Sequence, residues 1–437
     1  MRGAAGGQDC RLASERPRPW AYHTVRDVPL TAALLASAVV LLWLLASAAS
    51  RGQGFLAFAA GAVALGLAWV AFRRGRRSVL YGFWFLLLLA TVTAAAFELL
   101  LRAWPGILKG AVANVAYTGY HWQRDGIYRL DPHRGPVMRP SFRRRMYWNG
   151  HWWSHETNAD GYRGERLLRA DAVFLGDSMV YGHGVEVDQA VPARFQARSG
   201  LRSANLGQQG ACMVQQLLTF LVTGVRLRPR VVFVCTHPTD LEDAVRHYGT
   251  SELIRFVSGP AQEASARPRV EPEFRPRPPW HPVAFWSLHV ALPMESSGVL
   301  GAVARGIRRK GQVAAVPRDP FVPTPGERAT GLDELVPPGL ADPALPWRAH
   351  RHALGEIRRA CQRIGARLVL FDLGYPDALS AAVEAAAREL GAGYSGAGRS
   401  VVERALRGEP MYLRDDGHWS PEGVDAIAAA LVDSVPD

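Results

Sequence analysis

Lysine is almost missing from this 437-residue chain, which has only Lys109 and Lys310. Arginine therefore supplies nearly all of the 51 basic residues and of the net charge of +12. With abundant alanine and glycine beside it, this bias favours a GC-rich bacterial genome over a polyanion-binding surface, since net charge by itself reports on solubility and non-specific contacts. The sequence also lacks nucleic-acid motifs and clustered arginine–aromatic modules. We therefore expect no nucleic-acid partner.

Cysteine is scarce as well, and its positions exclude the usual metal sites. Neither the cysteines nor His237 and His247 have the spacing of metal ligands. We therefore expect no metal and no cofactor. A buried free thiol is the default for each cysteine, although a location outside the cytoplasm permits a disulfide. The four are Cys10, Cys212, Cys235 and Cys361.

Long apolar runs are confined to the first hundred residues. A polar tail over 1–27 precedes three apolar stretches over 28–49, 54–72 and 78–101. Each approaches the roughly 20 residues that cross a bilayer, and no clean signal-peptide cleavage site follows the first. We therefore expect a cytoplasmic, disordered tail and then three transmembrane helices over 28–101.

The distribution of arginine predicts the orientation of these helices. Five arginines precede the first stretch and four lie between the second and third, whereas only Arg51 lies between the first and second. By the positive-inside rule, the N-terminus is cytoplasmic and everything after Arg102 lies on the far side of the membrane. The sequence thus predicts a multi-pass protein of a bacterial inner membrane, with the lipid bilayer as a partner.

Residues 102–169 are aromatic and basic, and they separate the apolar stretches from the rest of the chain. We expect a linker followed by a strand-rich prelude that packs against the next domain. Two other readings stay open: a belt of aromatic side chains at the lipid headgroups, or aromatic platforms for sugar rings. The remaining residues, 170–437, then form the principal domain.

The stretch from Ala172 to Val185 reads AVFLGDSMVYGHGV. Its first four residues are an apolar run ending in Gly-Asp, the pattern of a buried parallel strand. Ser178 then lies at the carboxyl end of that strand, where open α/β sheets bind ligands. A serine nucleophile needs a base, and the base needs an acid that fixes its tautomer. His418 and Asp415, which share one loop near the C-terminus, supply both.

From Ala172 onward, short apolar runs alternate with amphipathic stretches. Strands are expected over 172–175, 203–206, 231–235 and 367–371, and helices over 191–198, 213–225, 347–364, 377–390 and 421–432. This alternation predicts an α/β fold, a doubly wound α/β/α sandwich around a parallel sheet. A proline-rich insertion over about 250–346 should be irregular except for a helix over 283–308. It serves equally well as a lid, as an acceptor-binding wall or as a surface excursion.

These motifs resemble those of the SGNH (GDSL-type) hydrolases and their O-acyltransferase relatives, over roughly 158–437. The blocks occur in the order of that family. Gly-Asp-Ser places the family's nucleophile on Ser178, and the glycine that ends Asn-Leu-Gly-Gln-Gln-Gly, Gly210, matches an oxyanion-hole residue. The final D-x-x-H block places the acid on Asp415 and the base on His418. The lead-in over 157–164 is similar to that of membrane-anchored bacterial members.

The chain departs from the family pattern at one position, and at another it offers two candidates for the acid. Where the family carries Asn-Asp, with the asparagine donating to the oxyanion, this chain has Thr239-Asp240. Thr239 has a hydroxyl to donate, but it is shorter and aimed differently, and losing one such donor costs about 3 kcal/mol of transition-state stabilisation. Asp416 is an alternative acid beside Asp415, although the family spacing favours Asp415.

The resemblance implies a membrane-anchored, extracytoplasmic serine esterase that acts on ester-linked acyl groups. Two alternatives come from other classes. One is an O-acetyltransferase or deacetylase of cell-envelope polysaccharide, whose substrate is an acylated glycan and which needs a membrane partner protein as acyl donor. The other is a weakly active binding or assembly protein, because Thr239 replaces the usual asparagine.

Overall fold

The computed structural model describes residues 77–104, 117, 126–148, 150–259, 321–414 and 416–435. The chain divides into two compact units, 1–97 and 98–437. Of the three expected membrane spans, those over 28–49 and 54–72 lie outside the described residues, and helix α3 (Arg77–Ala103) corresponds to the third. No helix in the described part of the chain is both long enough and apolar enough to cross a membrane. The three expected spans are therefore not supported by the described residues.

A five-stranded parallel sheet organises the second unit. Its strands lie in the order β6-β5-β7-β8-β9, which is 2-1-3-4-5 in chain order, the flavodoxin-like arrangement. They are β5 (Ala172–Leu175), β6 (Ser203–Asn205), β7 (Val231–Thr236), β8 (Arg367–Asp372) and β9 (Gly393–Ser395). In the register, Ala172 of β5 lies between Ser203 and Val231 of its two neighbours. β5 is thus an interior strand with a neighbour on each side.

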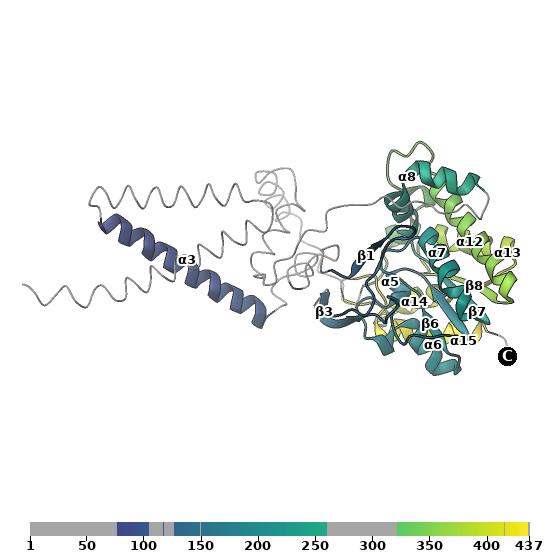
Figure 1. Ribbon diagram of the computed structural model, residues 1–437, viewed down its shortest axis with the longest axis horizontal. Helices are drawn as coiled ribbons and strands as arrows, with labels where there is room; N and C mark the ends of the chain where they lie inside the picture. The colour runs from purple at the N-terminus through teal and green to yellow at the C-terminus, as the bar shows by residue number, and fades with distance from the viewer. Residues whose placement is uncertain are drawn as a thin grey trace, which may run out of the picture. The chain divides into compact units, whose positions relative to one another are not determined.

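Helices cover both faces of the sheet because successive side chains of each strand point to opposite faces. Val173 and Leu175 pack with α7 (Met213–Val222), α8 (Asp240–Ser258), α12 (Leu345–Ile364) and α13 (Asp377–Leu390). Ala172 and Phe174 pack with α6 (Val191–Ser199), α14 (Ala397–Leu406) and α15 (Pro421–Asp433). Figure 1 shows α12 and α13 on one side of β7 and β8, with α15 on the other. The predicted doubly wound α/β/α sandwich is confirmed.

Two antiparallel hairpins precede the sheet: β1 (Tyr128–Asp131) with β2 (Gly135–Met138), and β3 (Arg143–Trp148) with β4 (His151–Glu156). Met146 and Trp153, which face each other across β3 and β4, are buried in a small core that includes Tyr181 of the sheet domain. The guanidinium of Arg163, almost fully buried, donates to backbone carbonyls of Ser154 and of residues 181, 182 and 185. The hairpins and the sheet domain therefore share buried contacts.

The expected insertion is described only at its two ends. α8 extends into its start, and a short helix α11 (Pro325–Ala329) and a 3₁₀ turn (Leu332–Leu335) lie near its end. The helix expected over 283–308 lies outside the described residues.

Candidate active site

Ser178 follows β5 through a tight turn and begins the short helix α5 (Ser178–Tyr181). Gly176 is required in this turn, because a Cβ there would lie 2.3 Å from Val180 Cγ2 and 3.1 Å from Cys235 Cβ. Asp177 caps the helix by accepting the N–H of Met179 at 3.0 Å. Since β5 lies between β6 and β7, the turn presents Ser178 where the strand order of the sheet reverses, the usual place for a ligand in such sheets.

His418 reaches Ser178 from the loop that precedes α15. An isolated β-bridge between Tyr412 and Trp419 closes this loop, and Leu413 N–H donates to the His418 carbonyl at 2.8 Å. The Ser178 hydroxyl donates to His418 Nε2 at 2.8 Å, although the two residues are 240 positions apart. The fold thus brings together the serine and the histidine that the sequence motifs predicted.

The carboxylate that the structure places beside His418 is Asp416, the alternative to the Asp415 that the family spacing favours. His418 Nδ1 donates to Asp416 Oδ1 at 2.8 Å, and the backbone N–H of His418 donates to the same oxygen at 3.2 Å. A side chain two positions before the donor closes a local turn of the kind that aspartate commonly makes. This turn holds the Asp416 carboxylate beside the imidazole; Asp415 lies outside the described residues.

The protonation of the pair follows from its contacts. Burial disfavours the charged form of Asp416, but the charge and hydrogen bond of His418 outweigh burial and hold the pKa of this carboxyl below its usual range. Burial likewise opposes the charged form of His418, and the Asp416 carboxylate overcomes it and raises the pKa of the imidazole. Because an ionised carboxylate only accepts, Nδ1 carries the proton of the neutral ring. Nε2 is then free to accept the proton of Ser178.

The β3–β4 hairpin adds side chains that the sequence did not single out. Trp148 donates its indole N–H to Asp416 Oδ2, across 268 residues of sequence. Its ring meets His183 edge-on at 4.3 Å and His418 at 6.4 Å between ring centroids. His183 in turn lies 4.7 Å from His418 and donates through Nδ1 to Gln209 Oε1 at 2.9 Å. Trp148 and His183 therefore enclose the imidazole, and no local sequence signal distinguishes them from other aromatic residues.

Gly210, the expected oxyanion-hole glycine, lies in the loop after β6. It is exposed and has a φ of 68°, a backbone conformation that favours glycine. His247 Nε2 donates to its carbonyl at 3.0 Å, and Tyr128 donates its hydroxyl to the preceding Gln209 carbonyl at 2.9 Å. This loop is thus held by hydrogen bonds from α8 and from the first hairpin.

Thr239, the expected second oxyanion donor, is engaged elsewhere. Its hydroxyl lies 2.8 Å from His237 Nδ1, and its backbone N–H donates to the same nitrogen at 3.1 Å. His237 Nδ1 also lies 3.6 Å from Asp177 Oδ2. His237, whose sequence spacing does not fit a metal ligand, therefore lies beside the nucleophile turn.

The described cysteines, Cys212, Cys235 and Cys361, are free and buried. Burial raises the pKa of the Cys212 thiol far above its usual value, so the residue is not a competing nucleophile. Over the residues that the structure covers, no cluster of histidine, cysteine and acidic side chains is arranged to hold a metal ion.

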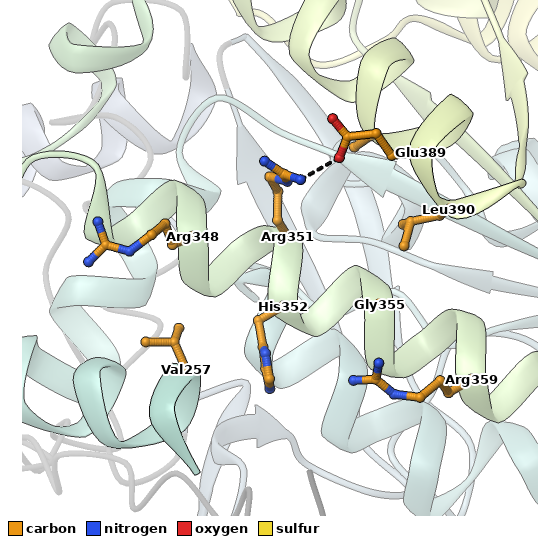
Figure 2. A pocket seen from close by; sticks show the side chains of 9 residues that line it. Val257, Arg348, Arg351, His352, Gly355, Arg359, Glu389 and Leu390 are labelled. Atoms are coloured by element: carbon orange, nitrogen blue, oxygen red, sulfur yellow. Dashed lines mark hydrogen bonds and ion pairs between the residues drawn. The ribbon is translucent and has the colours of Figure 1, made fainter. Parts of the chain in front are cut away.

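A pocket of about 470 Å³ opens along α12, beside α8 and α13, and no member of the serine site lines it. Figure 2 shows its arginines, of which Arg351 pairs with Glu389. Arg348 pairs with Asp342, and Arg359 is within ion-pair distance of Glu356. Each arginine thus has a carboxylate partner, and the pocket has no excess charge with which to select an anionic ligand.

Comparison with known proteins gives distant structural likeness only. No family model matches the chain, and no curated protein matches it. A GDSL-like lipase from Parabacteroides merdae is similar at 10% identity and a TM-score of 0.30, covering 62% of this chain and 98% of its own. A mutant of an acetyl-xylooligosaccharide esterase from Geobacillus Stearmophilus is similar at 11% identity and a TM-score of 0.28, covering 62% and 96%. Because both TM-scores are below 0.5, the fold and the site rest on the contacts of this chain alone.

Proposed function

We propose that the chain is a serine esterase of the SGNH type, in which Ser178 is the nucleophile, His418 the base and Asp416 the acid. The hydrogen bond of 2.8 Å between the Ser178 hydroxyl and His418 Nε2 is the observation that carries the proposal. The second bond of 2.8 Å, from Nδ1 to Asp416, supports it by fixing the tautomer in which Nε2 accepts. The substrate class is an ester-linked acyl group, on a simple alcohol or on a glycan.

The proposed reaction has two halves. Ser178 Oγ attacks the ester carbonyl carbon while its proton moves to His418 Nε2, and Asp416 stabilises the imidazolium. The backbone N–H groups of Ser178 and Gly210 stabilise the negative charge that develops on the carbonyl oxygen. The C–O bond to the alcohol then breaks, the alcohol leaves with the proton from His418, and water releases the acyl group by the same steps.

A fluorophosphonate probe and an aryl acetate test this assignment. We expect the probe to label the wild-type chain and to fail with Ser178→Ala and His418→Ala, and aryl acetate hydrolysis to fall to background in both. Ser434→Ala is the matched control, because that hydroxyl only donates to the Leu431 carbonyl at the end of α15. Undiminished labelling of Ser178→Ala would exclude this residue as the nucleophile.

The same acyl-enzyme decides between hydrolysis and transfer. We propose water as the acceptor. Added oligosaccharide should therefore leave the rate of acetate release from an aryl acetate unchanged. Acetylated oligosaccharide formed faster than free acetate would instead assign the chain to the O-acetyltransferases, and would call for a membrane partner that delivers the acyl group.

We also propose that the chain is anchored in a bacterial inner membrane with the catalytic domain outside the cytoplasm. The apolar stretches over 28–49 and 54–72 and the arginines that flank them support this proposal. In spheroplasts, external protease should digest the domain after Arg102 without lysis. A domain that is protected until the cells are lysed would contradict the proposed orientation.

A further inference from the structure

The loop after β7 is the place where the second oxyanion donor is expected, and Thr239 does not supply it. The backbone N–H of Thr239 donates to His237 Nδ1 at 3.1 Å, and the Thr239 hydroxyl oxygen lies 2.8 Å from the same nitrogen. His237 directly follows β7, the strand next to the β5 that leads to Ser178. The ring of His237 therefore stands at the sheet edge from which the nucleophile turn also leaves.

The contacts of Nδ1 decide which nitrogen of this ring is a donor. A backbone N–H can only donate, so the bond from Thr239 N requires Nδ1 to accept. Asp177 Oδ2, at 3.6 Å, lies beyond hydrogen-bond distance from Nδ1. The neutral ring consequently carries its proton on Nε2. Burial, joined by the charge of His418, lowers the pKa of His237 against the opposing effect of Asp177 and Asp416, which keeps the ring neutral at neutral pH.

The ring and the nucleophile both lie next to Asp177. Asp177 Oδ2 lies 3.4 Å from Ser178 Oγ and 3.6 Å from His237 Nδ1, so the hydroxyl and the ring are neighbours of the same carboxylate oxygen. The side chain of His237 remains 19% exposed, which leaves it accessible to a bound substrate. His418 holds the other side of the hydroxyl at 2.8 Å, so the two histidines approach Ser178 from different loops.

We propose that His237 donates its Nε2–H to the oxyanion and so replaces the asparagine of the family pattern, a role that rests on the proposed serine esterase function. His237 keeps its proton throughout: it makes a hydrogen bond to the developing alkoxide and forms no bond to the substrate. Thr239 acts through His237, as a positioning residue that fixes the donor tautomer. The departure from asparagine at Thr239 is then compensated two residues earlier in the chain.

Three substitutions of His237 separate donation from shape. His237→Ala removes the ring, His237→Phe keeps a ring without a donor, and His237→Gln places an amide N–H near the position of Nε2. We expect kcat for an aryl acetate to fall roughly 10²- to 10³-fold in the first two, the usual effect of losing one oxyanion donor. We expect His237→Gln to recover most of this loss, with KM nearly unchanged throughout. His133→Ala, an exposed histidine in the turn between β1 and β2, is the matched control.

A second measurement excludes a purely structural effect. Affinity for a trifluoromethyl ketone, which forms an oxyanion on Ser178, should fall by the same factor as kcat, with an unchanged melting temperature. If Ser178→Ala is inactive while His237→Ala stays within about threefold of wild type, the oxyanion role alone is overturned. A glutamine variant as slow as the alanine variant overturns it too. Hydrolysis that persists in Ser178→Ala removes the serine mechanism itself, and this proposal with it.

Discussion

Asp416→Asn tests the assignment of the acid, because each described hydrogen-bond partner of this carboxylate is a donor. Oδ1 accepts the backbone N–H of His418 at 3.2 Å and its Nδ1–H at 2.8 Å, and Oδ2 accepts the indole N–H of Trp148. An asparagine has one acceptor oxygen and one NH₂ group. Whichever way the amide turns, an N–H group of the amide must face another N–H group.

The two orientations have different costs. With its oxygen toward His418, the amide opposes Trp148, and the charge that supports the imidazolium is lost. A hydrogen bond to a charged group contributes about 1.5–3 kcal/mol, and an unsatisfied buried donor costs about 1–3 kcal/mol. With its NH₂ toward His418, the amide forces the proton onto Nε2, and this wrong tautomer lowers kcat by about 10⁴ in serine proteases. We therefore expect a loss in kcat of about 10² to 10⁴.

The assay compares kcat for an aryl acetate in Asp416→Asn and Asp415→Asn, with melting temperatures as the check on folding. Asp415→Asn should lose less than about tenfold. Asp425→Asn serves as the matched control, since Asp425 pairs only loosely with Arg194 and Arg198 on the surface, at 3.7 and 3.5 Å. A larger loss in Asp415→Asn than in Asp416→Asn would refute the reasoning and restore the acid of the family spacing.

Trp148→Phe keeps most of the ring but removes the hydrogen bond to Asp416, so steady-state kcat should fall about tenfold or more; an unchanged kcat would contradict a role in positioning the acid. His418 must be neutral to accept a proton, and its pKa is raised, so kcat/KM should rise with pH through a midpoint above about 6.5. A midpoint at or below 6.5 would count against His418 as the base. The raised pKa of His418 also stabilises the fold below about pH 6.5, and this contribution is lost as the pH rises through the pKa that His418 has in the folded state. His418→Gln should therefore lower the melting temperature more at pH 5.5 than at pH 9. Equal losses at the two pH values would exclude this linkage. In Gly423→Ala the new Cβ would lie 2.0 Å from the Met411 carbonyl oxygen, so the free energy of unfolding in urea should fall by about 1–3 kcal/mol. An unchanged free energy of unfolding would mean that the backbone there moves to make room for the methyl group.

Much of the sheet domain could be predicted because its signals are local. The helix expected over 377–390 has those bounds in the structure, and the nucleophile strand has its predicted four residues. α8 could not be predicted, because Gly249, at φ 74° and ψ 165°, interrupts it. Its buried residues change phase at this kink: Leu241, Ala244 and Tyr248 precede it, and Leu253 and Phe256 follow it. The spacing of one continuous helix therefore never appears in the sequence.

The candidate site also has residues that could be predicted from the sequence and residues that could not. Ser178 and His418 could be predicted, since each lies in a short motif whose chemistry needs a partner. The choice between Asp415 and Asp416 depends on a backbone turn that brings the second carboxylate under His418 N–H, and sequence spacing does not encode that turn. His237 and Trp148 could not be predicted, because their roles depend on contacts across the fold.

The β3–β4 hairpin shows why a boundary at 169/170 does not separate a linker from a self-contained active site. Trp148 holds the acid, and His151 donates through Nε2 to the Gly184 carbonyl at 2.7 Å, in the loop that follows α5. The backbone N–H of Ser154 donates to Glu186 at 3.1 Å, close to the same loop. An active site whose acid and nucleophile loop are both held by one hairpin responds to any displacement of that hairpin. The prelude is therefore a structural part of the proposed active site, and any displacement of it would alter the geometry of Asp416 and His418 directly.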